Sequence, residues 1–188
     1  LIINAMNENK SYLELIIGPM FSGKTSYLVN IYKKYKFCDL NILTINHSFD
    51  NRYSSTKLST HDSIQIPCIF LNSLVEVFNL GEYKNSNVIL INEGQFFNDL
   101  NECVKEFLKQ NKKVYIAGLD SDYQQKKFGE IIDLIPICDK IHKLHSLCAV
   151  CKNGEHAIFS KRISDEKQQT LVGNDNYIPV CRKCFFIN

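Results

Sequence analysis

A phosphate-binding loop near the start of the chain constrains the fold more than any other feature. Residues 18–25 read GPMFSGKT, which satisfies the pattern G-x-x-x-x-G-K-T. An apolar, strand-like run at residues 12–17 precedes the loop and a helical pattern follows it, so strand, loop and helix stand in the order that the motif requires. The alternative reading is an incidental glycine loop, and this context argues against it. The motif predicts a protein that binds a nucleoside triphosphate.

The residue types in the loop match the chemistry of such a site. Glycines let backbone N–H groups converge on phosphate at a helix N-terminus, where the helix dipole also favours negative charge. Lys24 is expected to reach the terminal phosphates, and the Thr25 hydroxyl is expected to bind Mg²⁺. The expected nucleotide-binding residues of the loop are Gly18, Pro19, Met20, Phe21, Ser22, Gly23, Lys24 and Thr25.

Composition narrows the class of protein. The 188 residues suffice for one good-sized core with a small appendage, and 45% hydrophobic with 22% charged residues is typical of a globular protein. A net charge of +2 argues against an extended nucleic-acid surface, and the apolar runs are too short to cross a membrane. The first residues lack the pattern of a signal peptide, so we expect a cytoplasmic, reducing location with no membrane partner.

Strand-like and helical patterns alternate, which predicts a mainly parallel α/β sheet with flanking helices. Strands are expected at residues 12–17, 41–45, 88–91 and 114–118. Helices are expected after the phosphate loop, at residues 74–80, and from residue 100, where Asn98 or Asp99 would be the N-cap. Residues 46–62 and 120–127 are polar loops. We expect a P-loop domain at residues 1–144 and a second, zinc-bearing module at residues 145–188.

Two Cys-x-x-Cys pairs lie in that second module. Cys148 with Cys151 and Cys181 with Cys184 give four thiolates, which is the usual ligand set of a closed, structural zinc site. Unpaired core cysteines are the alternative. His142 and His145 lie near the first pair but are interpreted as ordinary surface or strand residues. Four further cysteines are interpreted as buried small hydrophobic residues: Cys38, Cys68, Cys103 and Cys138.

An acidic residue follows the buried strand at residues 88–91. In P-loop proteins such a strand end supports the Mg²⁺ site, and the carboxyl ends of parallel strands are where α/β folds bind ligands. Here the strand ends in Asn92 and Glu93. Glu93 is therefore a candidate general base for an incoming hydroxyl. Its alternative role is an N-cap or a surface acid.

Taken together, these motifs resemble the type II thymidine kinases, the zinc-containing family of animal cytosol, many bacteria and large DNA viruses. The resemblance rests on GPMFSGKT, INEGQFFND, residues 50–53, Leu119 with Asp120, and the two cysteine pairs, and it runs from about residue 13 to 185. It implies a P-loop domain with a small zinc-bearing lasso domain, usually as a homotetramer. It also implies transfer of the γ-phosphoryl group of Mg-ATP to the 5′-hydroxyl of thymidine or deoxyuridine, in DNA precursor salvage, with feedback inhibition by thymidine triphosphate.

The resemblance also implies roles for individual residues. Glu93 matches the catalytic base. Further residues that face the phosphates would be Asp50, Asn51, Arg52, Asn92 and Gln95. The nucleoside pocket would comprise Met20, Phe96, Leu119, Tyr123, Phe128, Ser160 and Tyr177, together with the lasso residues Gln168, Gln169, Thr170, Leu171 and Val172.

The chain departs from the family pattern at three positions. Asn92 replaces the usual Asp, which withdraws a negative charge from the Mg²⁺ shell, so we expect reduced activity. Val172 replaces a lasso glycine, and Tyr123 replaces a common Phe, so its hydroxyl needs a partner. A catalytically weakened sensor or regulator is one alternative. A zinc-dependent nucleic-acid binder is the other, suggested by the basic pairs 161–162 and 182–183, although we expect no nucleic-acid partner.

Overall fold

The computed structural model describes residues 10–50, 57–59, 64–169 and 176–187, with no description of the Asp50 side chain. Its centre is a six-stranded sheet in the order β5-β2-β6-β7-β1-β8, and every neighbouring pair in it is parallel. The expected α/β fold with a parallel sheet is therefore confirmed. The strands are β1 (Tyr12–Ile17), β2 (Ile42–His47), β5 (Ile69–Leu71), β6 (Val88–Ile91), β7 (Lys113–Gly118) and β8 (Lys140–Lys143).

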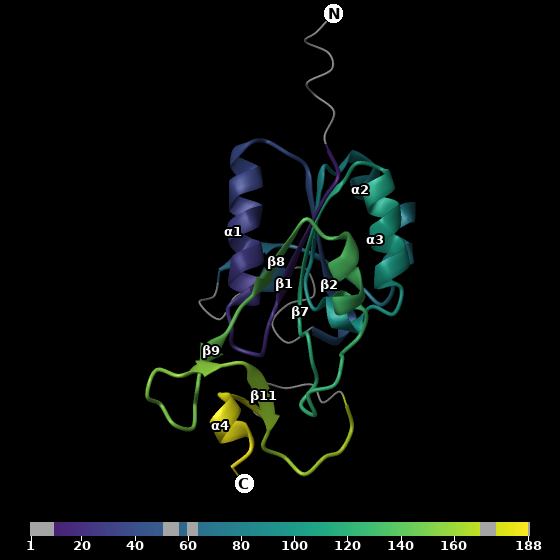
Figure 1. The fold of residues 1–188 in the computed structure, drawn as a ribbon. Helices are drawn as coiled ribbons and strands as arrows, with labels where there is room; N and C mark the ends of the chain where they lie inside the picture. Colours follow the sequence, from purple (N-terminus) through teal and green to yellow (C-terminus); the bar gives the residue numbers. More distant parts are fainter. Residues whose placement is uncertain (1–9, 51–56, 60–63, 170–175, 188) are drawn as a thin grey trace, which may run out of the picture.

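Helices cover both faces of this sheet (Figure 1). On β1, Leu13, Leu15 and Ile17 belong to one buried apolar cluster, whereas Ile16 belongs to another. Such alternation on two buried faces explains why the strands read as nearly continuous apolar runs. One face is covered by α1 (Lys24–Phe37). The other is covered by η3 (Leu74–Asn79), α2 (Gly81–Asn85), α3 (Leu100–Lys109) and η5 (Ile131–Ile137).

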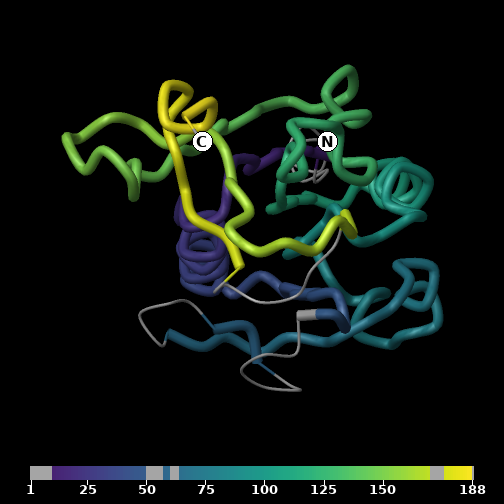
Figure 2. The backbone as a smooth tube through the Cα atoms, turned by 90° about the horizontal axis from the view of Figure 1, so that it is seen from below, coloured from purple at the N-terminus to yellow at the C-terminus, as the bar shows by residue number. Residues whose placement is uncertain are grey.

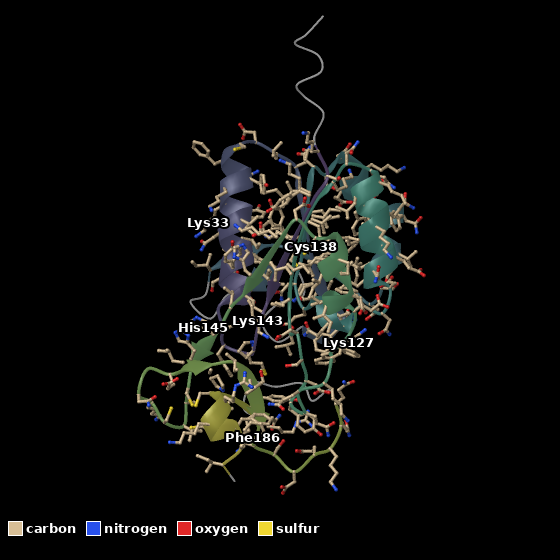
Figure 3. The ribbon with its side chains drawn as sticks, viewed as in Figure 1. Lys33, Lys127, Cys138, Lys143, His145 and Phe186 are labelled. Atoms are coloured by element: carbon tan, nitrogen blue, oxygen red, sulfur yellow. The ribbon has the colours of Figure 1, made fainter. Side chains whose placement is uncertain are left out.

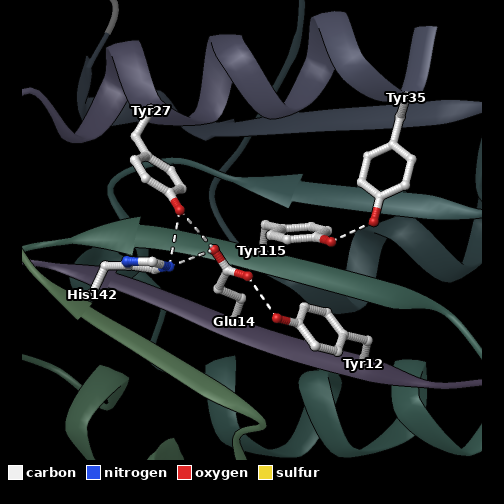
Figure 4. A network of polar contacts seen from close by, with 6 residues as sticks. All are labelled: Tyr12, Glu14, Tyr27, Tyr35, Tyr115 and His142. Atoms are coloured by element: carbon white, nitrogen blue, oxygen red, sulfur yellow. Dashed lines mark hydrogen bonds and ion pairs between the residues drawn. The ribbon is translucent and has the colours of Figure 1, made fainter. Parts of the chain in front are cut away.

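One acid interrupts the apolar face beneath α1 (Figure 4). Glu14 of β1 is 6% exposed and accepts hydrogen bonds from the Tyr12 hydroxyl at 2.7 Å and the Tyr27 hydroxyl at 3.1 Å. His142 of β8 contacts the same carboxylate at 2.9 Å through Nε2. Burial, and secondarily the Glu14 carboxylate, raise the pKa of Tyr12 and Tyr27. The network satisfies the hydrogen-bonding groups of a buried acid, and it ties α1 and the edge strand β8 to β1. His142 lies in a strand, which is one of the two alternatives that the sequence left open.

A small module follows the sheet and lies at its carboxyl-terminal edge (Figures 1 and 2). It contains two antiparallel ribbons and a short helix, packed around a cluster that includes Cys148, Ala157, Val180, Cys181 and Cys184. His145 lies where the chain passes from β8 into the module (Figure 3). The elements are β9 (Ser146–Leu147), β10 (His156–Ala157), β11 (Phe159–Arg162), β12 (Tyr177–Val180) and α4 (Arg182–Phe185).

Several expectations need correction. The helix expected at residues 74–80 is the 3-10 helix η3, and residues 46–62 include the end of β2, η2 (Ser48–Asp50) and β3 (Lys57–Ser59), which pairs with β4 (Gln65–Pro67). Asp99 occupies the N-cap position of α3 without capping it, because its carboxylate accepts the Ser73 hydroxyl and the Val75 amide instead. Two of the four lone cysteines are not buried as expected: Cys38 is exposed at the end of α1, and Cys138 is only partly buried.

No helix within the described ranges is long and apolar enough to cross a membrane.

Candidate active site

The phosphate loop is shaped by positive φ angles. Gly18 has a φ of 148°, and a Cβ atom there would lie 2.4 Å from the backbone oxygen of Leu144, so only glycine fits. Phe21 and Gly23 have φ angles of 62° and 83°, and Gly23 is the residue before α1. Left-handed residues of this kind form a concavity of backbone N–H groups that suits an anion. The loop therefore has the local geometry that its sequence predicted.

Lys24 folds back over this loop. Its ammonium donates to the backbone oxygen of Pro19 at 2.6 Å, and the Ser22 hydroxyl donates to the same oxygen at 2.8 Å. Burial lowers the pKa of Lys24 to about 8, against the opposing effect of the Glu93 and Asp120 carboxylates. These two acids follow β6 and β7, so the carboxyl ends of three strands bring charged groups to the same place.

Asn92 connects the loop to two neighbouring strands. Its Oδ1 accepts from the Thr25 hydroxyl at 3.4 Å, and its Nδ2 donates to Oδ1 of Asn46 at 3.1 Å. The same oxygen of Asn46 accepts the backbone N–H of His47 at 3.1 Å. Our sequence reasoning missed Asn46. Its position directly after the strand expected at residues 41–45 is a signal that could have identified it, because α/β folds bind ligands at the carboxyl ends of parallel strands.

Glu93 is held by its neighbours in an uncommon backbone conformation. Its φ is 52°, and Gln95 Nε2 donates to its carboxylate at 2.6 Å. Gln95 Oε1 accepts the Leu119 N–H at 3.0 Å, which is possible because Gly118 has no side chain in the way. Glu93 occupies the N-cap position of η4 (Gly94–Phe96) but makes no side-chain cap bond, which weakens the alternative role of an N-cap. The arrangement orients a carboxylate beside Lys24.

The residues expected around the nucleoside form two groups. In the first, the ring of Phe96 packs edge-on against Phe128 at a centroid distance of 5.6 Å, close to Gln95 and Leu119. In the second, the Ser160 hydroxyl of β11 accepts the Met20 N–H of the phosphate loop at 2.9 Å.

Tyr123, Tyr177 and the described lasso residues Gln168 and Gln169 join the second group through Arg162, which our sequence reasoning assigned only to a basic pair. The Tyr123 hydroxyl has the partner it was expected to need, the backbone oxygen of Lys167 at 3.0 Å. Five expected site residues lie outside the described part of the chain: Asn51, Arg52, Thr170, Leu171 and Val172.

The four expected zinc ligands come together. The sulfur atoms of Cys148, Cys151, Cys181 and Cys184 all lie within 4.8 Å of one another. Separations of this size are compatible with a tetrahedral ion bonded to sulfur at about 2.3 Å, and four thiolates leave no open position. The donor set therefore fits structural zinc.

The sheet, the phosphate loop and the acid at a strand end together define the general class of protein. A parallel sheet, a G-x-x-x-x-G-K-T loop at a helix N-terminus and an acid at a neighbouring strand end are the parts of a P-loop protein that handles a phosphorylated nucleotide. The Cys₄ module is an addition to that class.

Comparison with known proteins gives the family. The thymidine kinase family matches residues 11–185. The chain is 40% identical to the thymidine kinase of Yaba monkey tumor virus over 96% of this chain and 98% of the relative, and 39% identical to that of vaccinia virus (strain Ankara), over 94% and 98%. It is 40% identical to thymidine kinase a of Arabidopsis thaliana, over 94% and 75%. The chain belongs to the thymidine kinase family, as the motifs predicted, and it is an enzyme that phosphorylates thymidine.

A solved structure is also similar in part. Domain III of the Thermotoga maritima replication initiation protein DnaA aligns over 76% of this chain and 58% of that chain, with a TM-score of 0.42 and 18% identity. At this level the likeness carries no argument about function.

Proposed function

We propose that the chain transfers the γ-phosphoryl group of Mg-ATP to the 5′-hydroxyl of thymidine, with Glu93 as the general base. The observation that supports this role most directly is the 2.6 Å hydrogen bond from Gln95 to Glu93, at the strand end beside Lys24. A carboxylate fixed in this way can orient the hydroxyl and accept its proton during in-line attack. The rest of the chemistry is positioning and charge stabilisation, as in other phosphoryl transfers.

The phosphate side of the site comprises the loop from Gly18 to Thr25. Its amides and Lys24 bind the triphosphate, and Ser22 keeps the loop in shape through Pro19. Thr25 and Asn92 are the residues that would hold Mg²⁺, directly or through water. The ion, when bound, neutralises charge that develops on the phosphates. Asp50, Asn51 and Arg52 are proposed to approach the same phosphates on the strength of the family pattern alone.

The nucleoside side is proposed to lie between the two groups described above. The aromatic residues would enclose the base, and the lasso residues 168–172 would bind its polar edge through the backbone. One methyl group contributes only about 1–3 kcal/mol in such a pocket, so deoxyuridine is proposed as a second substrate. On the strength of the family pattern, we also propose that the chain divides into a P-loop domain (residues 1–144) and a zinc-bearing lasso domain (residues 145–188).

Other properties are proposed from family membership. They are a homotetrameric assembly, a cytoplasmic location, a role in DNA precursor salvage, and feedback inhibition by thymidine triphosphate.

The direct experiment is transfer of labelled phosphate from γ-labelled ATP to thymidine in the presence of Mg²⁺. Labelled thymidine monophosphate is the expected product. Absence of product from a folded protein that still binds ATP and thymidine would favour the second candidate, a weakened nucleotide-binding relative. Asn92 is the one observation that supports that candidate, and family membership favours the active kinase.

Replacing Asn92 by Asp should strengthen the Mg²⁺ site. The change restores a negative charge beside Thr25, and outer groups of this kind typically alter metal affinity or activity by roughly 10–100-fold. The new carboxylate oxygen would face Oδ1 of Asn46, so the Asn46 amide must rotate and give up its bond from His47. We therefore expect the Mg²⁺ concentration that gives half-maximal activity to fall by about tenfold. Thermal stability should fall slightly, because a hydrogen bond is lost.

Asn98→Asp is the matched control, because it adds the same charge on an exposed residue of the same loop. Titration of activity with Mg²⁺ in both variants is the measurement. Unchanged kcat and unchanged Mg²⁺ dependence in Asn92→Asp would show that position 92 does not contribute to the metal site.

A further inference from the structure

The guanidinium of Arg162 donates hydrogen bonds to several acceptors within the chain. It is the last residue of β11 and is paired with Tyr177 in the antiparallel register of β11 and β12. Its Nη1 donates to the backbone oxygens of Glu166, at 2.8 Å, and Gln168. Its Nη2 donates to the backbone oxygen of Gln169 at 3.2 Å and to the Tyr177 hydroxyl. One guanidinium thus holds three carbonyl groups and one phenol.

The same side chain also connects two segments that are distant in the sequence. The guanidinium lies over the ring of Tyr123 at 3.9 Å from its centroid, and over the ring of Tyr177 at 5.0 Å. Cation–π contacts of this kind hold a guanidinium against an aromatic face. Residues 123 and 177 belong to the set expected around the nucleoside, so Arg162 contacts two members of that set directly.

Two further bonds close the connection. The Tyr123 hydroxyl donates to the backbone oxygen of Lys167 at 3.0 Å, and Gln169 Nε2 donates to Asp122 at 2.8 Å. Asp122 is 6% exposed and also accepts the backbone N–H groups of Gln124 and Lys126, which fixes its own loop. Arg162 therefore lies at the centre of a junction between residues 122–126 and residues 166–169.

Only arginine has the geometry for this position. A guanidinium presents its donors in a rigid, planar fork, and here the two Nη groups point to four acceptors. A lysine ammonium is a point charge with three donors, and it cannot stack flat on Tyr123 while reaching the same carbonyls. Because the guanidinium donors are directed inward to the chain's own oxygens, the basic pair at 161–162 supports internal ordering more than contact with a nucleic-acid backbone.

We propose that Arg162 is a positioning residue for the nucleoside site. It acts by ordering the segment 166–169 and Tyr177 against Tyr123, without touching the phosphates or the reacting hydroxyl. This inference rests on the proposed function, because it deepens the account of the same site. The arrangement would couple the affinity for the nucleoside, and not the affinity for ATP, to this one side chain.

The experiment compares Arg162→Gln, Arg162→Lys and Lys161→Gln. Lys161 is a matched control, since it is basic, adjacent on β11, and bonded to the Cys184 and Ile187 oxygens on the side of the zinc module. For Arg162→Gln we expect the thymidine KM to rise by roughly tenfold or more, because several charge-assisted bonds are lost, with the KM for ATP unchanged. Arg162→Lys should recover only part of the affinity. Lys161→Gln should leave the thymidine KM unchanged.

A second measurement separates ordering from general unfolding. Trypsin should cleave after Lys167 faster in Arg162→Gln than in the wild type or Lys161→Gln, while all three proteins retain their zinc content. A thymidine KM that is unchanged in Arg162→Gln, or that rises together with the KM for ATP and with zinc loss, would overturn the inference. If the wild type itself transfers no phosphate to thymidine, the proposed function fails instead, and the cleavage assay alone still tests the ordering role.

Discussion

Replacement of Glu93 by glutamine should lower kcat by roughly 10²–10⁴-fold, the range that general base catalysis contributes. Glutamine has the same shape, and its amide oxygen can still accept the bond from Gln95, so the local structure should persist. What disappears is the ability to accept a proton from the attacking hydroxyl. Equilibrium binding of ATP and of thymidine should therefore be retained while turnover, measured with γ-labelled ATP, falls.

Glu102→Gln is the control for the removal of one negative charge. Glu102 is exposed in the first turn of α3 and lies outside the INEGQFFND motif, so the Glu102→Gln variant should keep the wild-type kcat. The Glu93 variant also serves as the control for a contaminating kinase in the preparation. Wild-type turnover by Glu93→Gln would remove this residue from the mechanism, and loss of ATP or thymidine binding would mean that the substitution damaged the site more broadly.

The elements of the fold that could be predicted are those that a pattern in their own residues marks. β1 is found at the residues where the apolar run predicted it. The spacing of apolar residues also predicted the buried face of α3, which includes Leu100, Cys103, Val104 and Phe107. β8 was not predicted. Its sequence, KIHK, lies at the edge of the sheet with three of four residues exposed, so neither a continuous apolar run nor a clear alternation marks it. An edge strand depends on its single neighbour more than on its own pattern.

The same distinction applies to the site. The phosphate loop, the Cys₄ cluster and the position of Glu93 follow from short motifs, and the expected need of the Tyr123 hydroxyl for a partner was correct. The acceptor of that hydroxyl, the backbone oxygen of Lys167, could not be deduced, because it lies 44 residues away. Arg162 looked like a surface residue for the same reason. Its role arises from contacts with Tyr123 and with backbone carbonyl groups. Every residue has a backbone carbonyl, so the sequence does not indicate which of them accept a hydrogen bond.

The second large effect should follow removal of a zinc ligand. Cys181→Ser is expected to release the metal, lower the thermal stability of the module and raise the thymidine KM. Structural zinc contributes about 10–16 kcal/mol of apparent binding free energy in small modules, and the energy is coupled to folding. Cys181 follows β12 directly and precedes α4, so loss of the cluster should loosen the ribbon of β11 and β12.

The consequence for function follows from what that ribbon carries. Ser160 accepts the Met20 N–H of the phosphate loop, and Tyr177 is held by Arg162, so both would lose their alignment when the ribbon loosens. The P-loop sheet has its own apolar clusters and should stay folded, which predicts a weaker effect on ATP binding than on thymidine binding. The measurements are zinc content, calorimetric unfolding, and the two KM values.

Cys38→Ser is the matched control, because Cys38 is an exposed cysteine at the end of α1 and outside the Cys₄ cluster. It should keep the wild-type zinc content, stability and kinetics. A Cys181→Ser protein with unchanged stability and unchanged thymidine KM would mean that the cluster does not support the nucleoside site. Equal losses of ATP and thymidine affinity would mean that the module stabilises the whole chain, since selective weakening of thymidine binding is the mark of a metal that acts through the β11–β12 ribbon.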